Sequence, residues 1–436
     1  MRYGLPLILG AVACGAIYSF VNGGPTRAAD GADAQPPSFS YTAALSPAAA
    51  ITSGPQRIDY RYIDQRLTRL AGSKDMVGVA IAIVENGQIS FVKGYGVTQI
   101  GTADPVTPTT VFRWASLSKG VAGTLVAELA REGRLSLDTP VSQFQTTLRL
   151  PGGAEDRVTV RDLLSQRTGV VRNAYDEKLE EGQDPKLIRA SLAQLPAFCS
   201  PGQCYTYQNV AFDAASEVVQ RVTGRPYGDV VRDKLFLPLG MTNASVGRAG
   251  LESAPSWARP HRSRGQMLQT KDAYYRVPAA GGVNSSIFDL AKWMRAQMGG
   301  ATAVLPSALL DEVHAPLVAT PPHGPRGEAD RALNAHAYGL GWRDFSYAGH
   351  RQVGHRGAVD GYRSLILFDP VERTGIAMLW NSHSSKPVGL QLELLDMLYG
   401  LPRHDWMKLD EKPAGPAVTV AAASVSTSPG RTGGGR

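Results

Sequence analysis

Strand-like segments occur at both ends of the chain, and the sequence between them is mostly helical. Residues 77–84 and 88–93 are two β-rich runs that flank the turn-forming dipeptide Asn86-Gly87, a pattern typical of a β-hairpin. Three further strand-like runs, whose short connections favour antiparallel pairing, lie at 351–354, 362–368 and 375–380. We therefore expect an α/β fold. One antiparallel sheet is built from the N- and C-terminal strands, helices flank it, and a mainly helical lobe is inserted between its two halves.

The middle of the chain has helical periodicity. One apolar stripe has the four-residue spacing of a helix face and ends near Gly133; its members are Leu117, Val121, Leu125 and Leu129. A second helix is predicted over 210–222, since Gly224 follows as a typical C-terminal stop. A cleft between the helical lobe and the sheet is the natural place for a binding site.

The N-terminus has the layout of an export signal. Arg2 precedes an apolar run, and a segment rich in Gly, Pro and Ala follows. The last residues are rich in Pro, Gly, Ser and Thr and contain no aromatic side chain after Trp406, a composition typical of disorder. We predict an export signal, a linker, one folded domain and a disordered tail, over 1–28, 29–56, 57–410 and 411–436 respectively.

The apolar run, residues 5–21, is shorter than the roughly 20 residues that a membrane-spanning helix needs. We therefore expect cleavage and a periplasmic or secreted protein. Cys14 leaves lipid attachment, and with it a transient or lipid-mediated membrane association, as an alternative. In an oxidising compartment Cys199 and Cys204 are expected to form a disulfide that stiffens the turn they enclose. The alternative is two unpaired thiols.

Charge and composition exclude several classes of function. The net charge is +7, but the lysines and arginines are scattered, and no basic run interleaved with aromatics occurs; we therefore expect no nucleic-acid partner. The histidines are dispersed and the His-Glu-x-x-His pattern is missing from the sequence, so no metal and no other cofactor is predicted. The sequence also lacks the Gly-x-Ser-x-Gly pattern of α/β-hydrolases. We expect a monomer.

A serine three residues before a lysine occurs twice, as Ser90 with Lys93 and as Ser116 with Lys119. The first pair lies on a predicted strand, where residues three apart point to opposite faces and cannot cooperate. The second pair lies in the first turn of a predicted helix, where residues three apart share a face. A lysine whose pKa is lowered by burial can serve as the base that a serine nucleophile needs. The alternative is that Ser116 only caps the helix and Lys119 lies in solvent.

Tyr207 and Asn209 stand just before the second predicted helix. Residues two apart in an extended loop project the same way, so the phenol and the amide can face one cleft. A phenol near ammonium groups can carry protons, and an amide can hold a substrate amide. The alternative is an ordinary capped helix start.

A third group, His355 to Ala358, follows the end of a predicted strand. Gly357 would let a substrate backbone approach closely, and the Ala358 amide would be an oxyanion donor opposite the amide of Ser116. The alternative for His355 is a structural histidine.

In the order Ser-x-x-Lys, Tyr-x-Asn, His-x-Gly, these motifs resemble the penicillin-recognising serine hydrolases. The most similar branch contains class C β-lactamases, serine D-Ala-D-Ala carboxypeptidases and related esterases. The resemblance covers most of 57–400. It includes the opening hairpin, the pair Pro201-Gly202 and the segments 159–164, 237–241 and 280–282.

The resemblance implies a role for each motif residue. Ser116 would attack a carbonyl and form an acyl-enzyme, Lys119 and Tyr207 would share the proton transfers, and Asn209 would hold the substrate amide. His355 replaces the lysine of class C β-lactamases, and Arg356 stands where a threonine hydroxyl often contacts the substrate carboxylate. This departure argues against efficient β-lactam turnover, although a guanidinium can itself bind a carboxylate.

The implied function is that of an exported serine hydrolase acting on amide bonds of β-lactam or D-Ala-D-Ala type. Its substrate would be a small molecule or derived from peptidoglycan. An esterase or D-aminopeptidase on the same scaffold is a second hypothesis, and a non-catalytic peptidoglycan-binding protein is a third.

Overall fold

The computed structural model describes residues 56–262, 265–321 and 327–410. The chain divides into two compact units, 1–49 and 50–436, and every described residue belongs to the second. The predicted export signal, linker and tail lie outside the described residues, apart from Gln56 at the end of the linker.

An antiparallel sheet built from both ends of the chain forms the centre of the second unit, as predicted. Its order is β2-β1-β11-β10-β9-β8-β7-β6, so the N-terminal hairpin pairs directly with the last strand. Asn86 and Gly87 form the hairpin turn, with φ of 52° and 76°. The strands are β1 (Gly78–Glu85), β2 (Gln88–Gly96), β6 (Val318–Ala319), β7 (Asn334–Tyr338), β8 (Arg343–Tyr347), β9 (His350–Val359), β10 (Tyr362–Asp369) and β11 (Thr374–Trp380). A second, small sheet has the order β3-β5-β4, with β3 (Val111–Arg113), β4 (Ser245–Val246) and β5 (Val283–Ser286).

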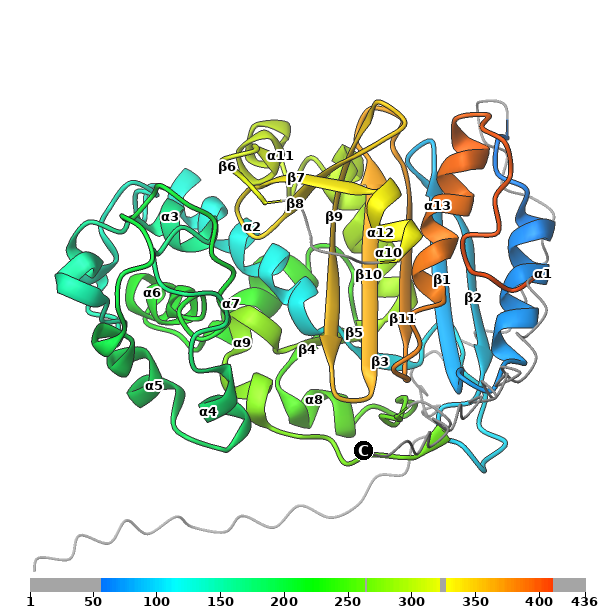
Figure 1. The fold of residues 1–436 in the computed structure, drawn as a ribbon, viewed down its shortest axis with the longest axis horizontal. Helices are drawn as coiled ribbons and strands as arrows, with labels where there is room; N and C mark the ends of the chain where they lie inside the picture. Colours follow the sequence, from blue (N-terminus) through cyan, green and yellow to red (C-terminus); the bar gives the residue numbers. More distant parts are fainter. Residues whose placement is uncertain (1–55, 263–264, 322–326, 411–436) are drawn as a thin grey trace, which may run out of the picture. The chain divides into compact units, whose positions relative to one another are not determined.

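Helices cover both faces of the large sheet. Figure 1 shows α1 and α13 over one face, and a lobe containing α3 to α7 beside the sheet. The helices are α1 (Tyr60–Ala71), α2 (Ser118–Arg131), α3 (Val160–Leu164), α4 (Asp176–Glu180), α5 (Pro185–Ser191), α6 (Ala214–Thr223), α7 (Tyr227–Val231), α8 (Arg248–Glu252), α9 (Pro278–Gly281), α10 (Ile287–Arg295), α11 (Ser307–His314), α12 (Glu328–Ala332) and α13 (Pro387–Leu398). No helix in the described ranges is long and apolar enough to cross a membrane.

The central strands are apolar on both sides because each face has its own core. Along β1, Ala80 and Ala82 belong to the core shared with the helical lobe, whereas Ile81 and Ile83 pack toward α1 and α13. This alternation is the period of two that a strand imposes. The small side chains lie on the face that α10 covers, so this helix packs closely against the sheet.

Two predicted boundaries differ from the structure by more than three residues. The helix predicted over 210–222 begins at Ala214, because residues 210–213 form turns and the Asp213 carboxylate accepts the Ala279 amide. The strand predicted over 351–354 continues to Val359. The prediction ended the strand at Gly354 because glycine is disfavoured in strands. In the structure β9 continues, because its small residues pack against the chain just before α2. The His355 to Ala358 group therefore lies inside a strand.

Candidate active site

Ser116 is held in a single 3₁₀ turn (Ala115–Leu117) that leads directly into α2. Ala115 has a left-handed φ of 50°, a strained conformation for a residue with a side chain and one that recurs at functional sites. Ser118 ties this turn down, since its hydroxyl donates to the Ala115 carbonyl at 2.7 Å and accepts from the Val283 amide at 3.0 Å. The turn directs the Ser116 side chain into a cavity.

Lys119 lies one helical turn further on and is completely buried. Its Nζ donates to Asn209 Oδ1 at 2.7 Å and to the Ala280 carbonyl at 3.1 Å, and it lies 3.4 Å from Ser116 Oγ. The predicted shared face of Ser116 and Lys119 is therefore present. Ser90 and Lys93 have separate partners, the Gln88 carbonyl and Asp64.

Burial lowers the pKa of Lys119 to about 7, because the charged form loses hydration. A neutral amine has two N–H donors and one lone pair. The two shorter contacts are to oxygen acceptors and use both donors, so the lone pair is left for the hydroxyl of Ser116. This geometry suits a base that removes the serine proton.

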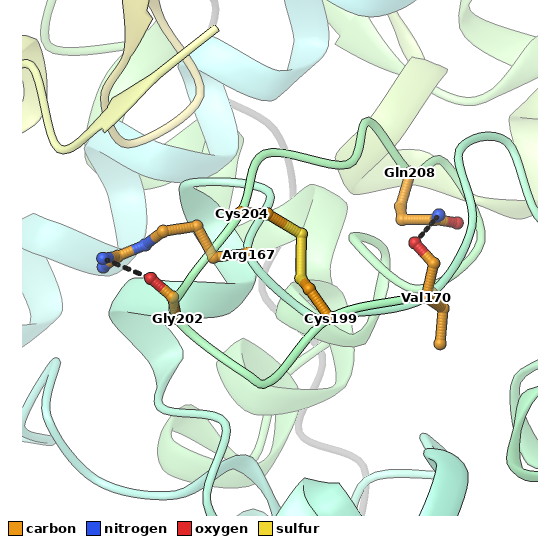
Figure 2. Close-up of a disulfide and its surroundings, with 6 residues drawn as sticks. All are labelled: Arg167, Val170, Cys199, Gly202, Cys204 and Gln208. Carbon is orange, nitrogen blue, oxygen red and sulfur yellow. Dashed lines mark hydrogen bonds between the residues drawn. A yellow bond between two sulfur atoms is a disulfide. The ribbon is translucent and has the colours of Figure 1, made fainter. Parts of the chain in front are cut away.

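The loop that carries Tyr207 and Asn209 has no regular secondary structure and is fixed from one side. The amide of Gln208, between them, donates to Gln166 Oε1 at 2.7 Å, and its buried side chain donates to the Val170 carbonyl at 3.4 Å (Figure 2). Because Gln208 points away from the cavity, its two neighbours both point into it, as the two-residue spacing predicted.

A disulfide joins Cys199 to Cys204 immediately before this loop (Figure 2). The enclosed turn is also held by Arg167, whose guanidinium donates to the Gly202 carbonyl at 3.5 Å. These contacts stiffen the approach to Tyr205 and Tyr207.

Tyr207 is nine-tenths buried, and burial raises the pKa of its phenol to about 12, although hydrogen bonding with Ser116 and the charge of Arg343 act in the opposite direction. A phenol with this pKa keeps its proton at neutral pH. Tyr207 is therefore suited to donate a proton, and Lys119 to accept one.

His355 is buried, and both of its ring nitrogens have protein partners. Nδ1 lies 2.8 Å from the Arg356 carbonyl, which can only accept, so Nε2 accepts from the Tyr338 hydroxyl at 3.1 Å. Burial and the nearby charges of Arg343 and Lys119 hold the pKa of His355 well below its usual range. The ring is neutral and orients its neighbours, and it does not supply the positive charge of a lysine at this position.

Gly357 and Ala358 lie where β9 passes close to the turn that carries Ser116. A Cβ at Gly357 would come within 2.2 Å of the Trp114 carbonyl, so the missing side chain makes room for the chain before Ser116. Strand β8 pairs with β9 only as far as Gly354. Beyond it, on that side, β9 has no strand partner within the described ranges, and an open edge can receive a substrate backbone or an oxyanion.

Arg356 forms an ion pair with Asp330 of α12. A substrate carboxylate would have to share this guanidinium with Asp330. The aspartate lies 26 residues away in sequence, and no motif marked it.

Several charged residues of the cavity were missed, and two of them, Arg343 and Asp176, contact predicted site residues or their loop. Arg343 donates to the Tyr205 hydroxyl at 2.9 Å and lies 5.5 Å from the centroid of the Tyr207 ring. No carboxylate lies within ion-pair distance of Arg343 in the described part of the chain. Asp176, at the start of α4, accepts from Asn209 Nδ2 at 2.7 Å. Burial raises the pKa of Asp176 to about 6. Neither residue belongs to a recognisable motif.

The side chains meet in a cavity of about 420 Å³. Of the predicted catalytic and substrate-binding residues, all but Lys119 line it, and Lys119 lies directly beneath Ser116 and Asn209. The lining includes Ser116, Asp176, Tyr207, Asn209, Arg343, His355, Arg356, Gly357 and Ala358. Within the described ranges, no three His, Cys, Asp or Glu side chains come together in a way that could hold a metal ion.

Comparison with solved structures places the fold in the β-lactamase and transpeptidase class. An octameric penicillin-binding protein homologue from Pyrococcus abyssi matches with a TM-score of 0.69 and 24% identity, over 79% of this chain and 78% of that one. The D-alanine carboxypeptidase AmpC from Burkholderia cenocepacia matches with a TM-score of 0.63 and 21% identity, over 78% and 99%. At these identities the likeness concerns the fold.

Sequence comparison shows the family. A family model described as Beta-lactamase matches residues 63–399, and the chain therefore belongs to the beta-lactamase family of serine hydrolases. Protein flp from Staphylococcus aureus is 27% identical over 317 residues, which cover 70% of this chain and 60% of that protein. Unguisins hydrolase ungD' from Aspergillus campestris is 28% identical over 351 residues, or 76% and 64%. The chain thus spans less than two thirds of the length of these curated relatives.

Proposed function

We propose that the protein is a serine hydrolase that forms an acyl-enzyme through Ser116 and acts on amide bonds of β-lactam or D-Ala-D-Ala type. The observation that carries the proposal is the contact of Ser116 with a buried lysine whose pKa is near neutrality. A serine hydroxyl alone is a weak nucleophile, and a neutral amine beside it removes that limitation.

In this mechanism neutral Lys119 accepts the Ser116 proton while Oγ attacks the carbonyl carbon. The developing oxyanion is stabilised by the amides of Ser116 and Ala358. Tyr207 passes a proton to the leaving nitrogen and regains one from the Lys119 ammonium. Water then releases the acyl group by the reverse sequence, with Lys119 again as base.

Substrate contacts follow from the polar groups that line the cavity. Asn209 uses one Nδ2 hydrogen on Asp176, and its second hydrogen can hold the carbonyl of a substrate amide. Arg343, with no carboxylate partner in the described ranges, and Arg356 can bind a substrate carboxylate, a group common to penicillins and D-Ala-D-Ala peptides. The apolar run near the N-terminus supports export to the periplasm or the medium, where such substrates occur.

The second candidate is an esterase or D-aminopeptidase. It is favoured by His355, because a neutral, fully bonded imidazole stands where class C β-lactamases have a lysine. Turnover of a chromogenic cephalosporin, a D-Ala-D-Ala peptide and a p-nitrophenyl ester on one preparation separates the two candidates. A purely peptidoglycan-binding protein would turn over none of them.

The test of the nucleophile is covalent labelling by a fluorescent penicillin and a fluorescent fluorophosphonate. We expect the wild type to be labelled by at least one probe, and Ser116→Ala to lose the label and about 10⁴-fold or more of the hydrolysis rate. The other Ser-x-x-Lys pair supplies the matched control, since Ser90→Ala should label as the wild type does. Equal labelling of Ser116→Ala and wild type would overturn the assignment.

A further inference from the structure

A carboxylate, an amide and an amine form a hydrogen-bonded chain that ends at the nucleophile. Asp176 Oδ2 accepts from Asn209 Nδ2 at 2.7 Å, Asn209 Oδ1 accepts from Lys119 Nζ at 2.7 Å, and Lys119 Nζ lies 3.4 Å from Ser116 Oγ. The motifs account for the last three residues and leave Asp176 without a role.

The chemistry of the two ends fixes the orientation of Asn209. The side chain of a charged lysine can only donate, and an ionised carboxylate can only accept. The amide therefore turns its carbonyl to Lys119 and its NH₂ to Asp176. The reverse orientation would aim an N–H at the Lys119 nitrogen and occupy the lone pair that the Ser116 proton needs.

The backbone that presents Asp176 is strained. Asn173 and Tyr175, just before α4, have left-handed φ values of 54° and 61°. Such conformations cost about 1–3 kcal/mol each and persist where the surrounding structure requires them. Here they turn the start of α4 so that Asp176, rather than its neighbour Glu177, faces Asn209.

The charges around Lys119 come from several elements. Asp176 and Asp213 favour the ammonium form and Arg343 opposes it. Asp213 is itself paired with Arg189, and the nearby side chains of His355 and Tyr207 are neutral. Asp176 is faced on its own helix by Glu180 and Glu177, which raise its pKa further. Among the carboxylates in this group, Asp176 is the one joined to Lys119 through a single side chain.

We propose that Asp176 is a positioning residue for the hydrolysis: it locks the Asn209 amide with its carbonyl toward Lys119 and so keeps the lone pair of neutral Lys119 available to Ser116. The inference rests on the proposed function, because it assigns a role within that reaction. It adds a fifth residue to the Ser-Lys-Tyr-Asn group and places it in the helical lobe.

The test compares Asp176→Asn with Glu177→Gln, which removes the same charge from the next residue. The assay is the acylation rate with p-nitrophenyl acetate, a neutral substrate, as a function of pH. In Asp176→Asn the carboxamide can donate or accept, so the orientation of Asn209 is no longer fixed. We expect kcat to fall about tenfold with KM changed less than about twofold, and the acidic limb of the pH profile to move at least about half a unit lower, because an anion near Lys119 is gone.

The double variant Asp176→Asn/Asn209→Asp reverses the order of amide and carboxylate and is the sharper control. The amide introduced at position 176 is again held in one orientation, and the anion now contacts Lys119 directly, so the acidic limb should move above that of the wild type. Thermal melts should show all variants folded, since Asp176 is only partly buried and each substitution keeps the size of the side chain.

Two failures can be told apart. If the wild type forms no acyl-enzyme, the proposed function falls and the inference falls with it. If the wild type acylates normally and Asp176→Asn matches Glu177→Gln in kcat and pH profile, the inference alone is overturned. An acidic limb that moves upward in Asp176→Asn would also contradict it.

Discussion

Two buried cations show how differently this protein treats charge in its two cores. Arg66 belongs to α1 and has 5% of its side chain exposed. It pairs with Glu393 of α13 and with Asp405 and Asp410 in the chain after α13. Lys119, between the sheet and the helical lobe, is fully buried. No carboxylate of the described residues lies within ion-pair distance of Lys119.

The difference appears in the proton affinity of the two groups. Burial alone would lower the pKa of Arg66, but hydrogen bonds to Glu393 and Asp405 raise it above its ordinary value. Lys119 lacks a direct carboxylate, so burial lowers its pKa to about 7. Complete pairing makes a charge permanent and structural, whereas incomplete pairing leaves a group that can exchange a proton.

The largest effect should follow from Lys119→Met, which keeps the length of the aliphatic stem and removes the amine. We expect kcat/KM to fall about 10⁴-fold, since Ser116 loses its base. In the wild type the acidic limb of kcat/KM should lie near pH 7, where Lys119 becomes neutral.

The same substitution should lower activity but not the free energy of unfolding at pH 6. The folded protein releases the Lys119 proton near pH 7, and the unfolded chain holds it to about 10.5. Unfolding therefore takes up a proton between these values, and wild-type stability should rise with pH through this window. Urea unfolding of Lys119→Met should lack that rise, with stability at pH 6 equal to or above that of the wild type. A variant that is less stable at pH 6 would contradict the comparison.

Arg66→Met should give the complementary result. Removing the cation leaves Glu393 buried and without its strongest partner, which costs about 3–5 kcal/mol. Urea unfolding at pH 7 measures this loss, and the acylation rate with p-nitrophenyl acetate should stay within about twofold of the wild type. The exposed ion pair of Arg248 with Glu252 offers the control: Arg248→Met should lose less than about 1 kcal/mol. Loss of activity in folded Arg66→Met would remove the distinction between the two clusters.

What the sequence predicted well depends on short separations along the chain. The hairpin turn at Asn86 and Gly87, the shared face of Ser116 and Lys119, and the common direction of Tyr207 and Asn209 each follow from a spacing of at most three residues. Local backbone geometry fixes such relations before any tertiary contact is known. The resemblance of the three motifs to one family then predicted that they meet.

The contacts that tune the site lie beyond that range. Asp176 and Asn209 are 33 residues apart, and Arg343 and Tyr205 are 138 apart. Neither Asp176 nor Arg343 lies at a recognisable sequence distance from a motif residue. Only the packing of the lobe against the sheet brings them to the cavity. The extension of β9 through Gly357 was missed for a similar reason: propensity disfavours glycine in a strand, but contact with Trp114 excludes a side chain there.

Arg343 sharpens the comparison because this partly buried arginine, like Lys119, has no carboxylate within ion-pair distance in the described ranges. Its charge lowers the pKa of both Lys119 and Tyr207. Arg343→Met should therefore move the acidic limb of kcat/KM to higher pH and reduce activity at pH 7 about tenfold, with a smaller loss at pH 9 where Lys119 is neutral in both proteins. Arg351→Met, on the neighbouring strand and outside the cavity lining, is the matched control and should leave the profile in place. If the acidic limb of Arg343→Met stays where it is in the wild type, the low proton affinity of Lys119 comes from burial alone, and the guanidinium of Arg343 has its role in binding substrate.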